Sequence, residues 1–190
     1  MKKHLIISNM CYNYWVYSLC LKCEYLNPFC SIPKEYLPRL IDEFYDINYD
    51  NVEFKFFQEG DTIRYATYHN YPVAKIDGWL EVHYIHDNNL DKLKTKYYRR
   101  LERMKRCIEH KYDLQFLFFV GHIPDDKSCY FETEEDFAIL EKLLEHDNVV
   151  CYTKLQNVAN RFKRPNMVYV PNDAHEQTFV LNDYKLRLDI

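Results

Sequence analysis

The first residue of the chain that points to chemistry is Cys11, which comes shortly after the strand-like run His4–Ser8. The aromatic-rich segment after it predicts a helix from Cys11 to Leu21, so Cys11 stands where a strand passes into a helix. At a helix N-terminus, free N–H groups and the helix dipole favour negative charge, which makes a thiol easier to ionise. We therefore expect Cys11 to be a nucleophile. The alternative is a buried cysteine that acts as a small apolar side chain.

A cysteine nucleophile requires a histidine as its base and a third polar group that orients the imidazole ring. His83 and His86 are the candidates, because they follow a strand-like run and the sites of α/β folds gather at strand ends. On a regular strand the two histidines face opposite sides of the sheet, so only one can reach Cys11 unless the strand ends before His86. We prefer His86 as the base, with Asp87 or Asn9 as its orienting group, and keep His83 as the alternative.

A basic helix is predicted after these histidines, from Leu90 to Glu109 with Asn89 as its N-cap. Arg99 and Arg103 are four residues apart and share one face of this helix, where they can hold a phosphate, a carboxylate or the diphosphate of a nucleotide sugar. The alternative is an ordinary solvated helix face. The chain has neither a P-loop nor a GxGxxG motif.

The remaining sequence alternates between predicted strands and helices, which favours an α/β domain. Asp77-Gly78 is a strong turn signal and predicts a hairpin between Tyr71–Ile76 and Trp79–Ile85. The run Leu114–Val120 is almost continuously apolar, which is typical of a strand covered on both faces. Further strands are expected at 52–56, 149–152, 167–170 and, at an edge, 178–181, and further helices at 34–45 and at 134–146, the second capped by Thr133.

Composition limits the class of protein. A chain of 190 residues that is 47% hydrophobic suits one globular domain over residues 1–190. The net charge of -4 argues against a nucleic-acid binder, and without a long apolar run or a signal-peptide layout we expect no stable membrane insertion and a cytoplasmic location. Cys20-x-x-Cys23 has no second matched pair, so we expect no metal and no cofactor.

Three segments, taken together, resemble a bacterial family catalogued as domain of unknown function number 1919. They are Ile7–Cys11, Tyr71–Asp77, and Val82–His86 with the basic helix that follows it. Members of the family read Ser-Asn-Asn-Cys, then Tyr-Pro-Val-Gly with an acidic residue, then Ile-His-Phe-x-His and a helix ending in Trp-x-x-Arg. The resemblance implies a three-layer α/β/α fold with a mixed, partly parallel sheet, and a part in exopolysaccharide biosynthesis. A related family of presumed papain-like cysteine peptidases shares the early Asn-Cys.

These observations predict an enzyme of surface polysaccharide or glycan biosynthesis or modification, which uses a Cys/His pair for hydrolysis or acyl transfer. Its partner would be a glycan precursor or a nucleotide sugar, in contact with Ser8, Tyr12, Asp77, Arg99 and Arg103. Two alternatives stay open. One is a glycosyltransferase-type or sugar-nucleotide-binding protein without a cysteine nucleophile, and the other is a non-catalytic interaction module.

Overall fold

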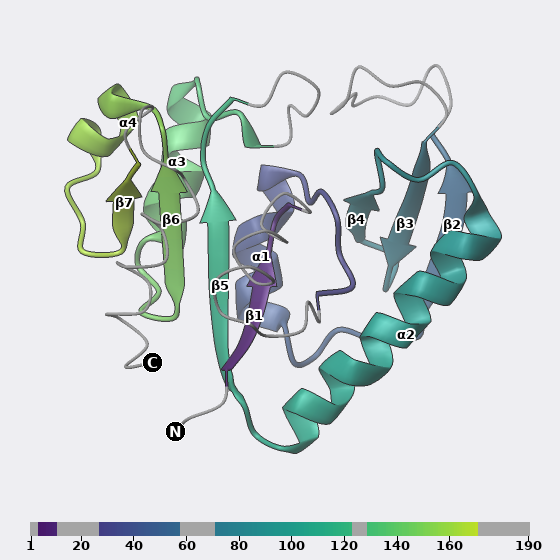
Figure 1. The fold of residues 1–190 in the computed structure, drawn as a ribbon. Helices are drawn as coiled ribbons and strands as arrows, with labels where there is room; N and C mark the ends of the chain where they lie inside the picture. The colour runs from purple at the N-terminus through teal and green to yellow at the C-terminus, as the bar shows by residue number, and fades with distance from the viewer. Residues whose placement is uncertain (1–3, 11–26, 58–70, 123–128, 171–190) are drawn as a thin grey trace.

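The computed structural model describes residues 4–10, 27–57, 71–122 and 129–170, which form an α/β fold with two sheets (Figure 1). The first sheet has four parallel strands in the order β1-β5-β6-β7. The second has three antiparallel strands in the order β2-β3-β4. The strands are β1 (His4–Ser8), β2 (Val52–Phe56), β3 (Pro72–Ile76), β4 (Leu80–His83), β5 (Asp113–Phe119), β6 (Val149–Thr153) and β7 (Met167–Tyr169).

The α/β class is confirmed, and the two kinds of strand pairing are divided between the two sheets. The expected hairpin is present, and its turn has the positive φ angles of a tight two-residue loop, 50° at Asp77 and 72° at Gly78. Among the described residues, an isolated bridge joins Ser31 of the segment 27–32 to His83 of β4, and the Ile32 N–H of the same segment donates to the Asn9 carbonyl after β1. The parallel and antiparallel parts are thus joined through a connecting segment.

Four α-helices complete the described fold, and their ends follow the capping residues of the sequence. They are α1 (Leu37–Glu43), which follows the 3-10 turn η3 (Lys34–Tyr36), α2 (Leu90–Glu109), α3 (Glu134–Leu143) and α4 (Gln156–Arg161). The Asn89 side chain accepts the Lys92 N–H at 2.9 Å, and Thr133 forms a capping box with Asp136. The predicted caps of α2 and α3 are therefore confirmed.

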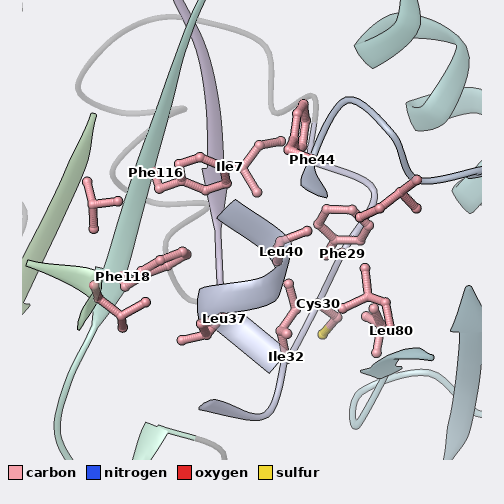
Figure 2. Close-up of a cluster of buried hydrophobic side chains, with 14 of the residues drawn as sticks. Ile7, Phe29, Cys30, Ile32, Leu37, Leu40, Phe44, Leu80, Phe116 and Phe118 are labelled. Carbon is pink, nitrogen blue, oxygen red and sulfur yellow. The ribbon is translucent and has the colours of Figure 1, made fainter. Parts of the chain in front are cut away.

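One hydrophobic core joins both sheets to the helices. Leu5 and Ile7 of β1 and Phe116 of β5 pack on one face of the parallel sheet, in the same cluster as residues of α1, α3 and α4. Side chains of the antiparallel sheet, such as Leu80, enter this cluster (Figure 2). The other face of the parallel sheet is also buried, with Leu117 in a second cluster, so β5 is covered on both faces as predicted.

The structure adds one helix to the prediction. The sequence predicts no helix at 156–161, yet these residues form α4, which is only 6 residues long. Arg161 at the end of α4 forms a double hydrogen bond with Glu134 of α3, at 2.8 and 2.5 Å. A tertiary contact thus supports a helix that is too short to be marked by its own periodicity. The predicted helix at 11–21 and the predicted strand at 178–181 lie outside the described residues.

Candidate functional site

The carboxyl end of β1 is fixed by two fully buried polar side chains, Ser8 and Asn9. The Asn9 amide continues the hydrogen-bond ladder between β1 and β5, because its Nδ2 donates to the Phe119 carbonyl and its Oδ1 accepts the Phe119 N–H, both at 3.0 Å. The Ser8 hydroxyl donates to the Met10 carbonyl at 2.8 Å and accepts the Met10 N–H at 3.2 Å. Both side chains therefore stabilise the point at which the chain leaves the sheet. Cys11 and Tyr12 lie outside the described residues.

The segment Asn27–Ile32 connects the end of β1 to the end of β4. On the β1 side, Asn27 Nδ2 donates to the Ser8 carbonyl at 2.8 Å, and the Ile32 N–H donates to the Asn9 carbonyl at 3.0 Å. On the β4 side, the N–H and carbonyl groups of Ser31 and His83 bond to each other at 3.0 and 2.8 Å. Because neighbouring strands are about 4.8 Å apart, the backbones of Asn9 and His83 are separated by about 10 Å.

His83 is completely buried, and both of its ring nitrogens have partners. Nε2 lies 2.8 Å from Oε1 of Glu81, and Nδ1 lies 3.0 Å from the Tyr71 hydroxyl. Glu81 and His83 share one face of β4, which places the carboxylate beside the ring. The hydrogen bond with His83 lowers the pKa of Glu81, although partial burial opposes this change.

The partners of His83 define the proton on its ring. An ionised Glu81 can only accept, so Nε2 carries the hydrogen, and in the neutral ring Nδ1 then accepts the Tyr71 hydroxyl. The Tyr71 ring is itself held by Phe57, which stacks on it with the ring centroids 5.1 Å apart. Glu81, His83 and Tyr71 therefore form a hydrogen-bonded chain in which the imidazole is well oriented. For His83 to accept a thiol proton at Nδ1, the Tyr71 hydroxyl must first turn away.

His86 has a different environment, because β4 ends at His83 and His86 lies in the exposed turn that follows. Its neighbour Asp87 forms an ion pair with Lys96 of α2, with 2.5 Å between Oδ2 and Nζ. Lys96 also lies over the Tyr84 ring, 6.0 Å from its centroid. Of the two arrangements foreseen for the histidines, the structure has the one in which the strand ends before His86.

Asp77 has a structural task in the hairpin turn. Its N–H donates to the Asn51 carbonyl at 2.7 Å, and its carboxylate accepts the Asn48 N–H and the Asn51 side chain, both at 3.3 Å. The turn lies at the opposite end of β4 from His83. His83 pairs with Val73, four residues before Asp77, so at about 3.3 Å per residue the turn lies about 13 Å along the hairpin from His83. The structure does not bring Asp77 together with the histidines.

Arg99 lies beside a shallow hollow on the outer surface of α2, with a volume of about 420 Å³, whose lining includes Lys92 and Lys96. The Arg99 side chain is exposed, and Arg103 lies one turn further along the helix and is partly buried. Since Lys96 also binds Asp87, the hollow is adjacent to the turn that carries His86. The structure thus brings Arg99 near the predicted His86 and Asp87 group, while Asn9 and His83 are grouped around the segment 27–32.

Sequence reasoning missed a further histidine, His122, which follows the carboxyl end of β5. Its Nε2 lies 3.0 Å from Oε1 of Glu132, and its ring stacks on Tyr130 with the centroids 4.4 Å apart. The rule that led to His86, a histidine directly after a strand, applies equally to His122. Glu81 and Tyr71 were also missed as partners of His83. The period of two along a strand was sufficient to find Glu81.

The described residues contain no group of three or more His, Cys, Asp or Glu side chains that could hold a metal ion. Cys30, Cys107, Cys129 and Cys151 are buried cysteines that are not joined to one another in disulfides. Burial raises the pKa of the Cys151 thiol far above its ordinary value, which disfavours the thiolate that a nucleophile requires. Within the described part of the chain, no helix has the length and apolar character needed to cross a membrane.

Comparison of the chain with protein-family models, with curated proteins and with solved structures found no match. The resemblance in the three quoted segments therefore stays a prediction that rests on those motifs.

Proposed function

We propose that this protein is an enzyme of surface polysaccharide or glycan biosynthesis or modification, which uses Cys11 and a histidine for hydrolysis or acyl transfer on a glycan precursor. The observation that supports it is that the strand before Cys11 and the strand that carries His83 both end at the segment 27–32, which hydrogen-bonds to each. Cys11 stands two residues after Asn9 in the sequence. A nucleophile and its base need such neighbouring origins, since they must come within hydrogen-bond reach.

In the proposed reaction the Cys11 sulfur attacks the carbonyl carbon of an acyl group on the precursor, and the thiol proton passes to the imidazole. The bond between that carbon and the sugar oxygen breaks as the imidazolium returns the proton to the oxygen. Water then attacks the thioester in hydrolysis, or the hydroxyl of an acceptor sugar attacks it in acyl transfer. In either case the attacking group loses its proton through the same imidazole to the departing sulfur. The glycan as substrate class follows from the family resemblance.

The reaction requires an imidazole that is both oriented and able to accept a proton, and His83 and His86 each meet a different part of this requirement. His83 is oriented by Glu81 but has the Tyr71 hydroxyl on its second nitrogen. His86 is exposed beside the ion pair of Asp87 with Lys96. Replacing each histidine in turn by glutamine shows which one is the base. Only the loss of the base removes the proton acceptor and, with it, the pH dependence of turnover.

The test is deacylation of an O-acetylated polysaccharide and of a simple activated ester by the purified chain. We expect Cys11→Ser to abolish turnover of both substrates while the melting temperature stays nearly unchanged. Cys23→Ser, a cysteine a short distance along the chain, serves as the control and should retain activity. Full activity in the Cys11→Ser variant would mean that the thiol is not the nucleophile.

A second candidate is a protein that holds a nucleotide sugar through Arg99 and Arg103 without a cysteine nucleophile. The hollow beside Arg99 favours it, because Lys92 and Lys96 add two positive charges to its lining, against the one carboxylate of Asp91. Under this alternative, UDP-glucose raises the melting temperature of the wild-type chain and not that of the Arg99→Ala variant. If no ester is cleaved and no nucleotide sugar binds, the interaction module is the candidate that remains.

A further inference from the structure

Within the described parts of the chain β2 pairs with β3 alone, and its other edge carries the pattern Val52-Glu53-Phe54-Lys55-Phe56, which is complementary to itself. Strand β2 lies at the end of the order β2-β3-β4, and Figure 1 shows it as the outermost strand of this sheet. Glu53 and Lys55 are exposed and point to one face, while Val52 and Phe54 pack against the core on the other. An open strand edge of this kind is a template for pairing with another strand.

The backbone groups at this edge point outward. The Asp77 N–H donates to the Asn51 carbonyl, and the Phe57 N–H donates to the Tyr71 carbonyl. Directly opposed residues of an antiparallel pair alternate between bonded and non-bonded positions, so the residues at 51, 53, 55 and 57 bond to β3. The N–H and carbonyl groups of Phe54 and Phe56 therefore face away from β3, toward the open edge.

We propose that two copies of this chain pair through their β2 strands, antiparallel and centred on Phe54, and so form one continuous six-stranded sheet. In this register the two Phe54 residues exchange backbone hydrogen bonds, which agrees with the outward direction of their polar groups. Glu53 of each copy lies opposite Lys55 of the other, at the positions where cross-strand side chains come closest. Two ion pairs thus form around the two-fold axis.

Exposed aromatic side chains gather at the same edge. The described residues include three exposed large hydrophobic side chains, Tyr45, Phe56 and Tyr98. Two of them lie here, Phe56 at 36% and Tyr98 at 42%, since the Tyr98 ring is 6.3 Å from that of Phe54. Pairing places Phe56 of one copy opposite Val52 of the other and covers apolar surface. A shift by one residue puts the charged side chains opposite apolar ones, so the charges select this register and this occupant. The short strand makes a small interface, so the dimer should dissociate on dilution.

The experiment measures the mass of the 23.3 kDa chain by light scattering and sedimentation over a range of concentrations. We expect the wild-type chain to approach twice its monomer mass as concentration rises. Lys55→Glu places two glutamates opposite each other and should weaken association roughly tenfold or more. Glu53→Lys does the same with two lysines. Lys142→Glu on α3 makes the same change of charge away from this edge and should leave association unchanged.

The sharper result comes from mixing the two charge variants. Each is expected to be monomeric alone, while Lys55→Glu and Glu53→Lys together restore both opposite-charge pairs and should associate. Thermal unfolding of each variant alone identifies any loss of fold, and Phe56→Pro gives an independent test, since it removes an outward donor without changing charge. The proposal is overturned if the wild-type chain stays monomeric, if folded Lys55→Glu associates like the wild type, or if the two folded variants do not associate on mixing.

Discussion

The carboxyl group of Glu81, beside His83, makes the stability of the folded chain depend on pH. The folded-state pKa of Glu81 is lowered, mainly because its carboxylate accepts a hydrogen bond from His83. A lowered carboxyl pKa stabilises the folded chain above the pKa of the unfolded state, near 4.3, and this stability is lost as pH falls through the folded-state value. The contribution is therefore present at neutral pH and disappears in acid.

We expect Glu81→Gln to reduce the free energy of unfolding by about 1 kcal/mol at pH 7, a modest value because the carboxylate is partly exposed. The difference from the wild type should shrink as pH falls below about 4.3, where the wild-type carboxylate becomes protonated. Urea unfolding of both proteins at several pH values measures it. Glu109→Gln, at an exposed glutamate of α2, is the control. A constant difference across this pH range contradicts the prediction.

The residues of the candidate site differ in how far the sequence could reveal them. Glu81 lies two positions before His83 on a predicted strand, so their shared face follows from the sequence alone. Tyr71 comes from the other side of the hairpin, and its hydrogen bond to His83 depends on the register in which β3 pairs with β4. Asn9 was considered as a partner for a histidine, while its amide bonds to the backbone of Phe119, which is far away in the sequence. Such non-local pairings leave no pattern in a single sequence.

At the scale of elements, α2 shows how far the local sequence determines where a helix begins and ends. Its bounds, Leu90–Glu109, coincide with the prediction because Asn89 supplies the N-cap. We expect Asn89→Ala to lower the free energy of unfolding by about 1 kcal/mol, since the Lys92 N–H loses its acceptor. Asn88→Ala, at the exposed neighbour, should have almost no effect. Equal effects of the two substitutions in urea unfolding would contradict the capping role.

Other elements depended on contacts that local sequence does not contain. The strands were found from alternation and apolar runs, but their division into a parallel and an antiparallel sheet depends on which strands meet. Helix α4 was missed because its sequence is polar and its support comes from Glu134, in another helix. Propensity and capping are local properties, whereas strand order and short helices depend on tertiary contacts.

At the scale of the whole molecule, the core runs without interruption through both sheets. Ile7 and Phe116 of the parallel sheet and Leu80 of the antiparallel sheet belong to one cluster, with Phe29 and Leu40 between them (Figure 2). Because the two sheets share this core, neither sheet can unfold without exposing apolar side chains of the other to water. The prediction of one domain over residues 1–190 is consistent with this continuity and stays a prediction for the residues beyond those described.

We therefore expect the two sheets to unfold together in one transition. Trp79 lies beside the hairpin turn, against Tyr36 and Arg39, so its fluorescence reports on the antiparallel side. Far-UV circular dichroism reports on the helices of both halves. With Trp15→Phe to leave a single tryptophan, the two signals should give the same urea midpoint. Separate midpoints would show that the sheets unfold independently.

The side-chain amide of Asn9 takes the place of a backbone amide in its two hydrogen bonds with Phe119, and these bonds fix how β1 is aligned along β5. If β1 slipped by one position along β5, Ser8 or Met10 would face Phe119, and neither offers a donor and an acceptor with the geometry of an amide. The Asn9 amide thus permits only one register of β1 against β5. Asn9, which stands two residues before the proposed nucleophile in the sequence, would then serve catalysis indirectly, by fixing the register of the strand that precedes Cys11.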